Sequence, residues 1–283
     1  MMAVLVTGST GQVGRALRAA WATDDGPGMP VLWHGRRDAP SIDVTWDIGS
    51  DPAPNLPQGL IVLHLAGVLR GSAAQLAENR AMTRAVCQIA RNRRALHVFV
   101  MSSVAVYRPV AGLITELVTP DPQGDYGRAK RDAEAVAETT LQGPEAPSLT
   151  ILRLANLAGA DGLLGSCIPG RSVTLDPIAG QPGGPERSYI GPRALAAVLA
   201  RLVHLAGQGD ALPRIVNLAQ PPVVAMADLL AARGQDWHFG RQRLGAIARV
   251  AVSTDRLAAL LPLPPATPAS LIADLDSLRG RWP

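Results

Sequence analysis

A tyrosine and a lysine one helical turn apart are the residues of this chain best suited to move a proton. Tyr126 and Lys130 are four positions apart in a stretch with helical spacing, so both side chains fall on one helix face. An ammonium group beside a phenol stabilises the phenolate and lowers its pKa, which lets the phenol exchange a proton with a carbonyl or an alcohol. Of the 27 basic residues, Lys130 is the single lysine. Its presence where arginine is otherwise used indicates a need for an ammonium group; the alternative is a chance survivor on a solvated helix face.

Two serines are predicted to lie near this pair. Ser102 and Ser103 follow the apolar run that starts at His97, and ligands of open α/β sheets bind at the carboxyl ends of the strands. A hydroxyl group there can hydrogen-bond the reacting oxygen and stabilise the charge that develops on it. The alternative is a serine that caps a turn at the end of a strand.

A glycine-rich turn near the N-terminus predicts a dinucleotide site. It comes directly after an apolar run and opens a helical stretch. Glycine lets the backbone turn tightly and lets a pyrophosphate approach the helix N-terminus, where free N–H groups favour anions. The expected cofactor contacts of this turn are Gly8, Thr10, Gly11, Gln12, Val13 and Gly14.

The end of the next apolar run indicates which dinucleotide binds. A site for NAD usually offers a carboxylate to the ribose hydroxyls, whereas this chain has Arg36 and Arg37 before its first acid, Asp38. Paired guanidinium groups suit a 2′-phosphate. We therefore expect NADP(H) to be preferred, with NAD(H) as the other cofactor that the site could take. The alternative is two solvated arginines in an arginine-rich chain.

Apolar runs and helical stretches alternate along the first half of the chain. The predicted strands are Ala3–Thr7, Val31–His34, Leu60–Ala66, His97–Ser102 and Leu149–Leu154, and the predicted helices are Gln12–Ala22, Ala73 to about Arg93, and Tyr126–Leu141. Apolar strands separated by helices argue for a parallel sheet covered on both faces. The predicted fold class is α/β, a doubly wound parallel sheet of the NAD(P)-binding Rossmann type with a small C-terminal substrate lobe.

The composition of the sequence changes after Asn156. Residues 159–184 are rich in glycine and proline, and the later predicted elements are the helices Arg193–Ala206, Ala225–Arg233 and Leu271–Leu278, the strand Arg214–Leu218 and the connector Pro262–Pro268. We assign residues 1–157 to the dinucleotide-binding domain, with about 191–219 returning to it. About 158–190 and 220–283 are assigned to the substrate lobe.

Length and composition narrow the class of protein. A chain of 283 residues that is 47% hydrophobic can bury a large core, which excludes general disorder. Cys87 and Cys167 lack metal-like or redox-like spacing, so no metal site is expected. The net charge of +4 comes from scattered arginines without interleaved aromatic residues, which favours small anionic ligands over nucleic acid. Neither a membrane span nor a signal peptide is recognised, so a cytoplasmic location is expected.

Together these motifs resemble the extended short-chain dehydrogenase/reductases, also called the NAD-dependent epimerase/dehydratase family. The resemblance covers nearly the whole chain and is clearest over residues 3–157. The matching segments are the glycine turn Gly8–Gly14, Asp47 with Ile48, His64–Gly67, Asn79–Thr83, Ser102–Tyr107, Tyr126 with Lys130 and Glu134, and Leu152–Asn156.

The resemblance implies a role for each matching residue. Tyr126 would be the general acid or base, Lys130 would lower its pKa and hold the nicotinamide ribose, and Ser103 would bond the substrate oxygen. Asn79 would support the local hydrogen bonding, and hydride would pass between the nicotinamide and a substrate carbon. The further cofactor contacts that the resemblance implies are Asp47, Ile48, Leu65, Ala66, Gly67, Tyr126 and Lys130, and the substrate contact is Asn156.

Departures from the family pattern bear on the substrate. The dehydratases of the family carry Asp-Glu after the catalytic Ser or Thr, whereas this chain has Val104 and Ala105, which argues against dehydration. A family segment with two acids appears here as Arg187–Ala194 without them, which weakens the match to the sugar-nucleotide epimerases. Arg187, Arg249 and Arg256 are candidate ligands of a diphosphate, and the alternative is that they are solvated surface arginines.

We expect an oxidoreductase that transfers hydride between nicotinamide and a keto or hydroxy substrate, either a nucleotide sugar or a similar keto compound. The alternatives are a nucleotide-sugar 4-epimerase that retains NAD and, outside enzymes, a dinucleotide-sensing regulatory protein. The expected partner is a small molecule, with no nucleic acid and no membrane, and the family suggests a homodimer.

Overall fold

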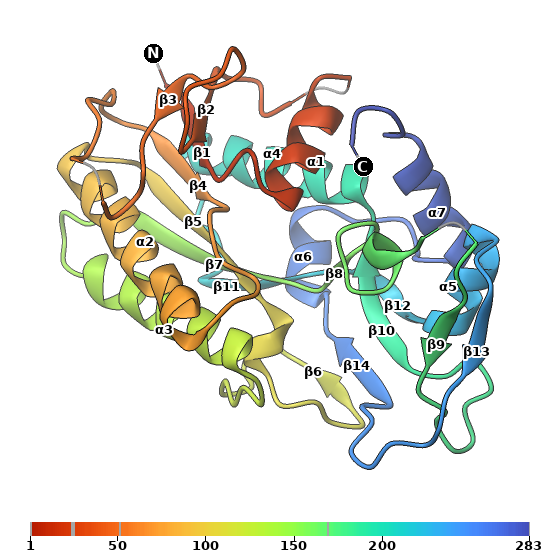
Figure 1. The fold of residues 1–283 in the computed structure, drawn as a ribbon. Coiled ribbons are helices and arrows are strands. Elements are labelled where there is room, and N and C mark those ends of the chain that lie inside the picture. Colours follow the sequence, from red (N-terminus) through yellow and green to blue (C-terminus); the bar gives the residue numbers. More distant parts are fainter. Residues whose placement is uncertain (1, 24–25, 51, 169, 283) are drawn as a thin grey trace.

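The computed structural model describes residues 2–23, 26–50, 52–168 and 170–282. Its main element is a seven-stranded sheet in the order β11-β7-β5-β4-β1-β2-β3, with every neighbouring pair parallel (Figure 1). The strands are β1 (Val4–Thr7), β2 (Val31–Gly35), β3 (Val44–Thr45), β4 (Ile61–His64), β5 (His97–Ser103), β7 (Ser148–Leu154) and β11 (Ile215–Leu218). Chain order reverses between β1 and β4, and the crevice at such a point is where open sheets bind ligands.

Two pairs of helices cover the sheet. Helices α2 (Ala73–Asn92) and α3 (Asp125–Thr140) contact each other on one face, and α1 (Gln12–Trp21) and α4 (Pro192–Gln208) contact each other on the other (Figure 1). The prediction of a doubly wound parallel sheet is confirmed. None of the helices in the described part of the chain combines the length and the apolar character needed to cross a membrane.

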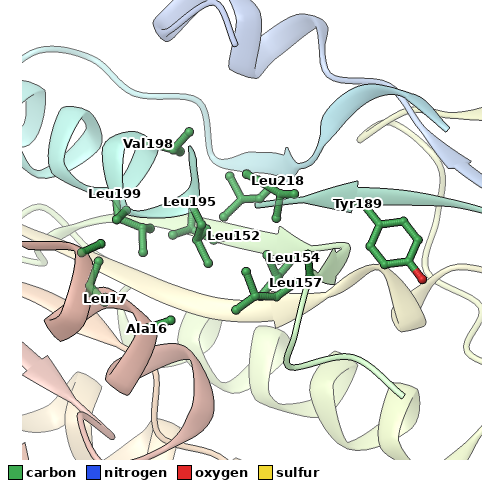
Figure 2. Close-up of a cluster of buried hydrophobic side chains, with 14 of the residues drawn as sticks. Ala16, Leu17, Leu152, Leu154, Leu157, Tyr189, Leu195, Val198, Leu199 and Leu218 are labelled. Carbon is green, nitrogen blue, oxygen red and sulfur yellow. The ribbon is translucent and has the colours of Figure 1, made fainter. Parts of the chain in front are cut away.

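The core lies on both faces of the sheet, because successive strand residues point to opposite sides. In β1, Val4 and Val6 belong to the cluster under α1 and α4, whereas Leu5 belongs to the cluster under α2 and α3. Figure 2 shows part of the first cluster, where Leu17 of α1 and Leu199 of α4 lie beside the sheet. Burial of this kind contributes roughly 1.5–3 kcal/mol for each large aliphatic side chain, so it fixes the sheet that carries the site.

A second, smaller sheet is built from short strands that are spread along the chain between residues 113 and 252. Five short strands form a second sheet in the order β12-β10-β14-β6, with β8 beside β10, and β13 pairs with β9. These strands are β6 (Leu113–Ile114), β8 (Asn156–Leu157), β9 (Val173–Leu175), β10 (Glu186–Ile190), β12 (Gln220–Ala225), β13 (Trp237–Phe239) and β14 (Arg249–Val252). The sequence does not predict them. The division of the chain at residue 157 stays a proposal, and β6 from its first part joins this second sheet.

The ends of some elements differ from the prediction. Helix α7 covers Pro268–Asp276 rather than Leu271–Leu278, because Thr267 and Ser270 form a reciprocal capping box with Pro268 in the first turn. The other helices of this region are α5 (Met226–Arg233) and α6 (Asp255–Leu260), and the short 3-10 helices η1 (Val104–Val106) and η2 (Leu164–Ser166) lie earlier in the chain.

Candidate functional site

A cavity of about 740 Å³ lies at the carboxyl ends of the sheet strands. Its wall contains predicted catalytic, cofactor and substrate residues, which come from the glycine turn, the segment after β4, β5, α3 and the second sheet. The predicted residues on the wall are Gly8, Gly11, Gln12, Val13, Gly14, Leu65, Gly67, Ser103, Tyr126, Lys130, Asn156 and Arg187. Segments far apart in the sequence therefore share one cavity of a size typical for small-molecule sites.

The glycine turn leaves no room for a side chain at Gly8 or at Gly14. Gly8 has φ +72°, and an added Cβ would lie 2.5 Å from the backbone N of Ala66. At Gly14 an added Cβ would lie 2.4 Å from the carbonyl oxygen of Gly8. No side chain caps α1, whose N-cap is Gly11, so the amide groups of its first turn are open to an anion. The turn therefore fits a dinucleotide pyrophosphate.

A buried histidine holds this turn, and sequence reasoning missed it. The backbone N–H of Gly8 donates to Nδ1 of His34 at 3.2 Å, and Nε2 of His34 lies 2.8 Å from the carbonyl oxygen of Trp46. Burial lowers the pKa of His34, so the ring is neutral, with one nitrogen accepting and the other donating. The position of His34 at the end of β2, beside a glycine turn, was the available signal.

Tyr126 and Ser103 meet on the cavity wall. Ser103 accepts a hydrogen bond from the backbone N–H of Ala105 at 3.2 Å, and Tyr126 is half-buried. Burial raises the pKa of Tyr126 to about 12, and the nearby hydroxyl of Ser103 opposes the rise. The phenol is therefore protonated near neutral pH and can donate a proton.

Lys130 is buried and faces the end of β5. Its Nζ donates to the carbonyl oxygen of Met101 at 2.9 Å and lies 3.0 Å from the point where a Cβ on Gly67 would be. Burial lowers the pKa of Lys130 to about 8, and the charge of Glu134 opposes this fall. The lowering of the Tyr126 pKa by Lys130 stays a prediction.

The pKa of Lys130 predicts a rise in stability at alkaline pH. Its ordinary value is 10.5, so between about pH 8 and 10.5 the unfolded chain binds more protons than the folded chain, and the free energy of unfolding increases with pH. The cost of burying the ammonium, about 3 kcal/mol, is fully present below pH 8. Urea unfolding across this window should show the rise in the native protein and not in Lys130→Met. If the free energy of unfolding changes with pH in the same way in both proteins, this prediction is contradicted.

Asn79 holds the segment that follows β4. Its Oδ1 accepts from the backbone N–H of Val68 at 3.0 Å, and its Nδ2 donates to the carbonyl oxygens of Val68 and Leu76, each at 2.9 Å. The side chain is buried and is not on the cavity wall. Its contacts make it a positioning residue for the segment that contains Gly67.

A buried network joins α3 to the sheet, and sequence reasoning did not predict it. Arg153 donates two hydrogen bonds to the carboxylate of Glu134, from Nε at 3.0 Å and Nη2 at 2.7 Å. Ser102 donates to the same carboxylate. Nη1 of Arg153 donates to the hydroxyl of Tyr107 at 2.8 Å, and that hydroxyl donates to Asn217 at 2.9 Å. Burial alone would lower the pKa of Arg153, but Glu134 and Tyr107 outweigh it and raise the pKa.

The network continues into the second sheet. Nδ2 of Asn217 in β11 donates to the carbonyl oxygens of Ile114 and Ser253, at 3.4 Å and 3.2 Å. The backbone N–H of Asn217 donates to Glu116 at 3.0 Å. One chain of buried polar groups therefore connects the helix of Tyr126 to both sheets.

Several predicted cofactor residues lie outside the cavity wall, namely Thr10, Arg36, Arg37, Asp47, Ile48 and Ala66. Arg36 and Arg37 are exposed just after β2, and neither guanidinium has a partner among the described residues. Ile48 is buried in the core cluster under α2 and α3. Asp47 is half-buried, and its charge acts on His34.

Two of the three predicted substrate residues, Asn156 and Arg187, are on the wall with Ser103 but already make hydrogen bonds to the backbone. Nδ2 of Asn156 donates to the carbonyl oxygen of Ser188 at 3.1 Å. Arg187 donates from Nη1 to Glu186 O at 2.8 Å and from Nη2 to Ile247 O at 2.9 Å. Burial lowers the pKa of Arg187. Its guanidinium is therefore engaged by the backbone.

A comparison with protein families matches residues 4–171 to the NAD dependent epimerase/dehydratase family. The chain belongs to this family. The resemblance drawn from the motifs is confirmed, and the chain is an NAD(P)-dependent enzyme of the extended short-chain dehydrogenase type. A comparison with curated proteins finds no match.

Solved structures of family enzymes share the whole fold. MoeE5 in complex with UDP-glucuronic acid and NAD has 20% identity and a TM-score of 0.74, with 98% of this chain and 99% of that chain covered. A UDP-galactose 4-epimerase has 19% identity and a TM-score of 0.75, with the same coverage. The dTDP-glucose 4,6-dehydratase DesIV from Streptomyces venezuelae, solved with NAD and TYD, has 18% identity and a TM-score of 0.74, with 99% of each chain covered. The predicted fold class is thus confirmed over the full length.

Proposed function

We propose that the protein transfers hydride between a nicotinamide cofactor and a keto or hydroxy substrate. The observation that carries this proposal is that Ser103, Tyr126 and Lys130 line the same cavity as the glycine turn. The substrate is a nucleotide sugar or a similar keto compound. The bound nicotinamide supplies or accepts the hydride.

Three side chains manage the proton and the charge. In carbonyl reduction Tyr126 gives its Oη proton to the carbonyl oxygen, and in alcohol oxidation it takes that proton back. Ser103 donates a hydrogen bond to the same oxygen and stabilises the negative charge that develops there. Lys130 provides positive charge near the phenolate and holds the nicotinamide ribose. Asn79 keeps the adjacent segment in place through its contacts with Val68.

An isotope experiment tests this reaction. Reduced cofactor that carries deuterium at the transferable position is incubated with the protein and a panel of keto compounds. Deuterium should appear on the carbinol carbon of the alcohol product, detected by mass spectrometry. Alcohol without deuterium, or no alcohol from any compound, would contradict hydride transfer.

We further propose a preference for NADP(H), because two unpartnered arginines follow β2. Arg36→Ala combined with Arg37→Ala should raise the Kd of NADPH by about tenfold, the loss expected for one charge-assisted hydrogen bond, and leave that of NADH within about twofold. Fluorescence titration of the reduced cofactors measures both values. Arg131→Ala, at an exposed arginine of α3, is the control. Tighter binding of NADH than of NADPH by the native protein would contradict the preference.

The second candidate is a nucleotide-sugar 4-epimerase, which the likeness to the UDP-galactose enzyme favours. An epimerase of this type keeps its NAD through the cycle, whereas a reductase exchanges its cofactor. Tightly held NAD in the purified protein would favour the epimerase, and exchangeable NADPH the reductase. A dinucleotide-sensing regulatory protein is disfavoured, since Ser103, Tyr126 and Lys130 are all present.

A further inference from the structure

The cavity wall outside the glycine turn is mostly aliphatic. Its apolar side chains come from the segment after β4, from η1, from β6 and from β14 with the residues before it. They include Val68, Leu69, Val104, Ile114, Ile247 and Val250. Four separate segments thus place branched apolar groups around one space, and such a surface recognises an apolar body rather than a polyhydroxylated one.

The polar side chains on this part of the wall are largely engaged by the protein. Asp161 accepts from the backbone N–H groups of Leu163 and Leu164, each at 3.1 Å. The hydroxyl of Tyr107 belongs to the buried network, and Gln123 donates to the carbonyl oxygen of Asp121 at 2.9 Å. Few of these groups are left to exchange hydrogen bonds with a sugar, and a sugar hydroxyl buried without a partner is costly.

The charges on the wall also disfavour a diphosphate. The basic side chains on the described part of the wall are Arg70, Lys130 and Arg187. Lys130 donates to a carbonyl at the end of β5, and Arg187 donates to backbone carbonyls. Arg70 is exposed and has no partner among the described residues. The carboxylate of Asp161 lies on the same wall and would repel a dianion.

The other arginines considered for a diphosphate are used elsewhere. Arg249 pairs with Glu186 at 2.9 Å, and Arg256 donates to the carbonyl oxygen of Ile215 at 2.9 Å. Neither is on the cavity wall. The cluster of cations that a diphosphate needs is therefore not assembled in the described part of the cavity.

Two wall residues expose apolar surface that a ligand would cover. Leu69 is 51% exposed and Ile247 is 42% exposed, although both line the cavity. Removing such surface from water favours binding in proportion to the area covered.

From the aliphatic wall, the engaged polar groups and the missing cations, we propose that the substrate is a ketone, or its secondary alcohol, with an aliphatic body and no diphosphate. This inference rests on the proposed function, because it names a substrate class for the proposed hydride transfer.

A homologous series of substrates tests this inference. Unbranched methyl ketones, lengthened by one methylene at a time, are offered with the reduced cofactor. Each methylene that the wall covers should raise kcat/KM by about fourfold until the cavity is filled. UDP-glucose should neither be turned over nor compete. A flat dependence on chain length together with competitive inhibition by UDP-glucose would overturn the proposal.

Matched variants locate the effect on the wall. Leu69→Ser and Ile247→Ser should each flatten the dependence on chain length, because each removes an aliphatic contact. Leu117→Ser and Leu244→Ser are the controls, since these leucines are 83% and 107% exposed and do not line the cavity. If kcat/KM rises equally per methylene in all four variants and in the native protein, the ketone binds elsewhere and the proposal is overturned.

A binding measurement separates this inference from the reaction itself. Calorimetric titration of the cofactor-loaded protein with the same ketones should give affinities that rise with chain length, whether or not turnover follows. Binding with this dependence but without deuterium transfer would reject the proposed reaction and keep the substrate class. Deuterium transfer to a nucleotide sugar, with no ketone bound, would keep the reaction and reject the class.

Discussion

Tyr126→Phe should lower kcat by roughly 10²–10⁴-fold, the usual contribution of a positioned general acid or base. The substitution removes one hydroxyl from a half-buried ring on the cavity wall. It leaves the glycine turn and Lys130 untouched, so the Kd of the reduced cofactor should stay within about twofold. Steady-state kinetics and cofactor fluorescence measure the two quantities on the same preparation.

Tyr189→Phe is the matched control for this loss. It also removes one phenol hydroxyl, which bonds Asp161 at 3.1 Å, but Tyr189 lies in the core rather than on the wall. Its kcat should stay within a few-fold of the native value. Full activity of Tyr126→Phe, or an equal loss in both variants, would refute the assigned role.

Arg153→Met should cost about 3–5 kcal/mol of unfolding free energy, because it leaves the buried carboxylate of Glu134 without its cation. Both side chains are almost completely buried, with 2% and 6% of their surfaces exposed. The substitution also removes the donor to Tyr107, so the hydrogen bonds that reach Asn217 lose one link. Urea unfolding followed by circular dichroism measures the change.

Two further variants define what the ion pair contributes. Arg128→Met breaks the exposed pair with Asp125 on the same helix and should cost less than about 1 kcal/mol. The double variant Arg153→Met, Glu134→Leu should recover much of the loss, because no uncompensated charge remains. Two results would show that Arg153 and Glu134 are not energetically coupled. One is a loss of unfolding free energy for Arg153→Met as small as that for Arg128→Met. The other is a double variant whose loss is the sum of the losses of its two single substitutions.

The large sheet could be predicted because its signals are local. Strands such as β1 and β5 are continuous apolar runs, and α1, α2 and α3 carry helical periodicity between them. The short strands of the second sheet carry no such signal. Leu113 and Ile114 form β6 only because Ala251 and Val252 pair with them, and a pairing between segments so distant in the chain cannot be read from either segment alone.

The candidate site likewise has parts that the sequence predicts and parts that only the fold reveals. The glycine turn and the spacing of Tyr126 and Lys130 are chemical patterns within one segment, so the sequence predicts them. The structure then brings both segments and Ser103 to one cavity. Ile247 and Val250 have no pattern of their own and reach the wall only because β14 packs against β10 and β6. The sequence does not predict the role of His34, because that role depends on a hydrogen bond from Gly8 that only the folded chain brings about.

The order of the strands in the chain has a consequence for biosynthesis. The edge strand β11 (Ile215–Leu218) pairs with β7 only after the chain has made a long excursion through η2, β9, β10 and α4. During translation the ribosome therefore releases six strands of the large sheet well before the seventh. Until then the outer edge of β7 has unpaired backbone groups, and before α4 is made one apolar face of the sheet lacks that helix as well. Such a nascent chain presents an open edge that favours association with other strands, so the arrival of β11 also protects the sheet from aggregation.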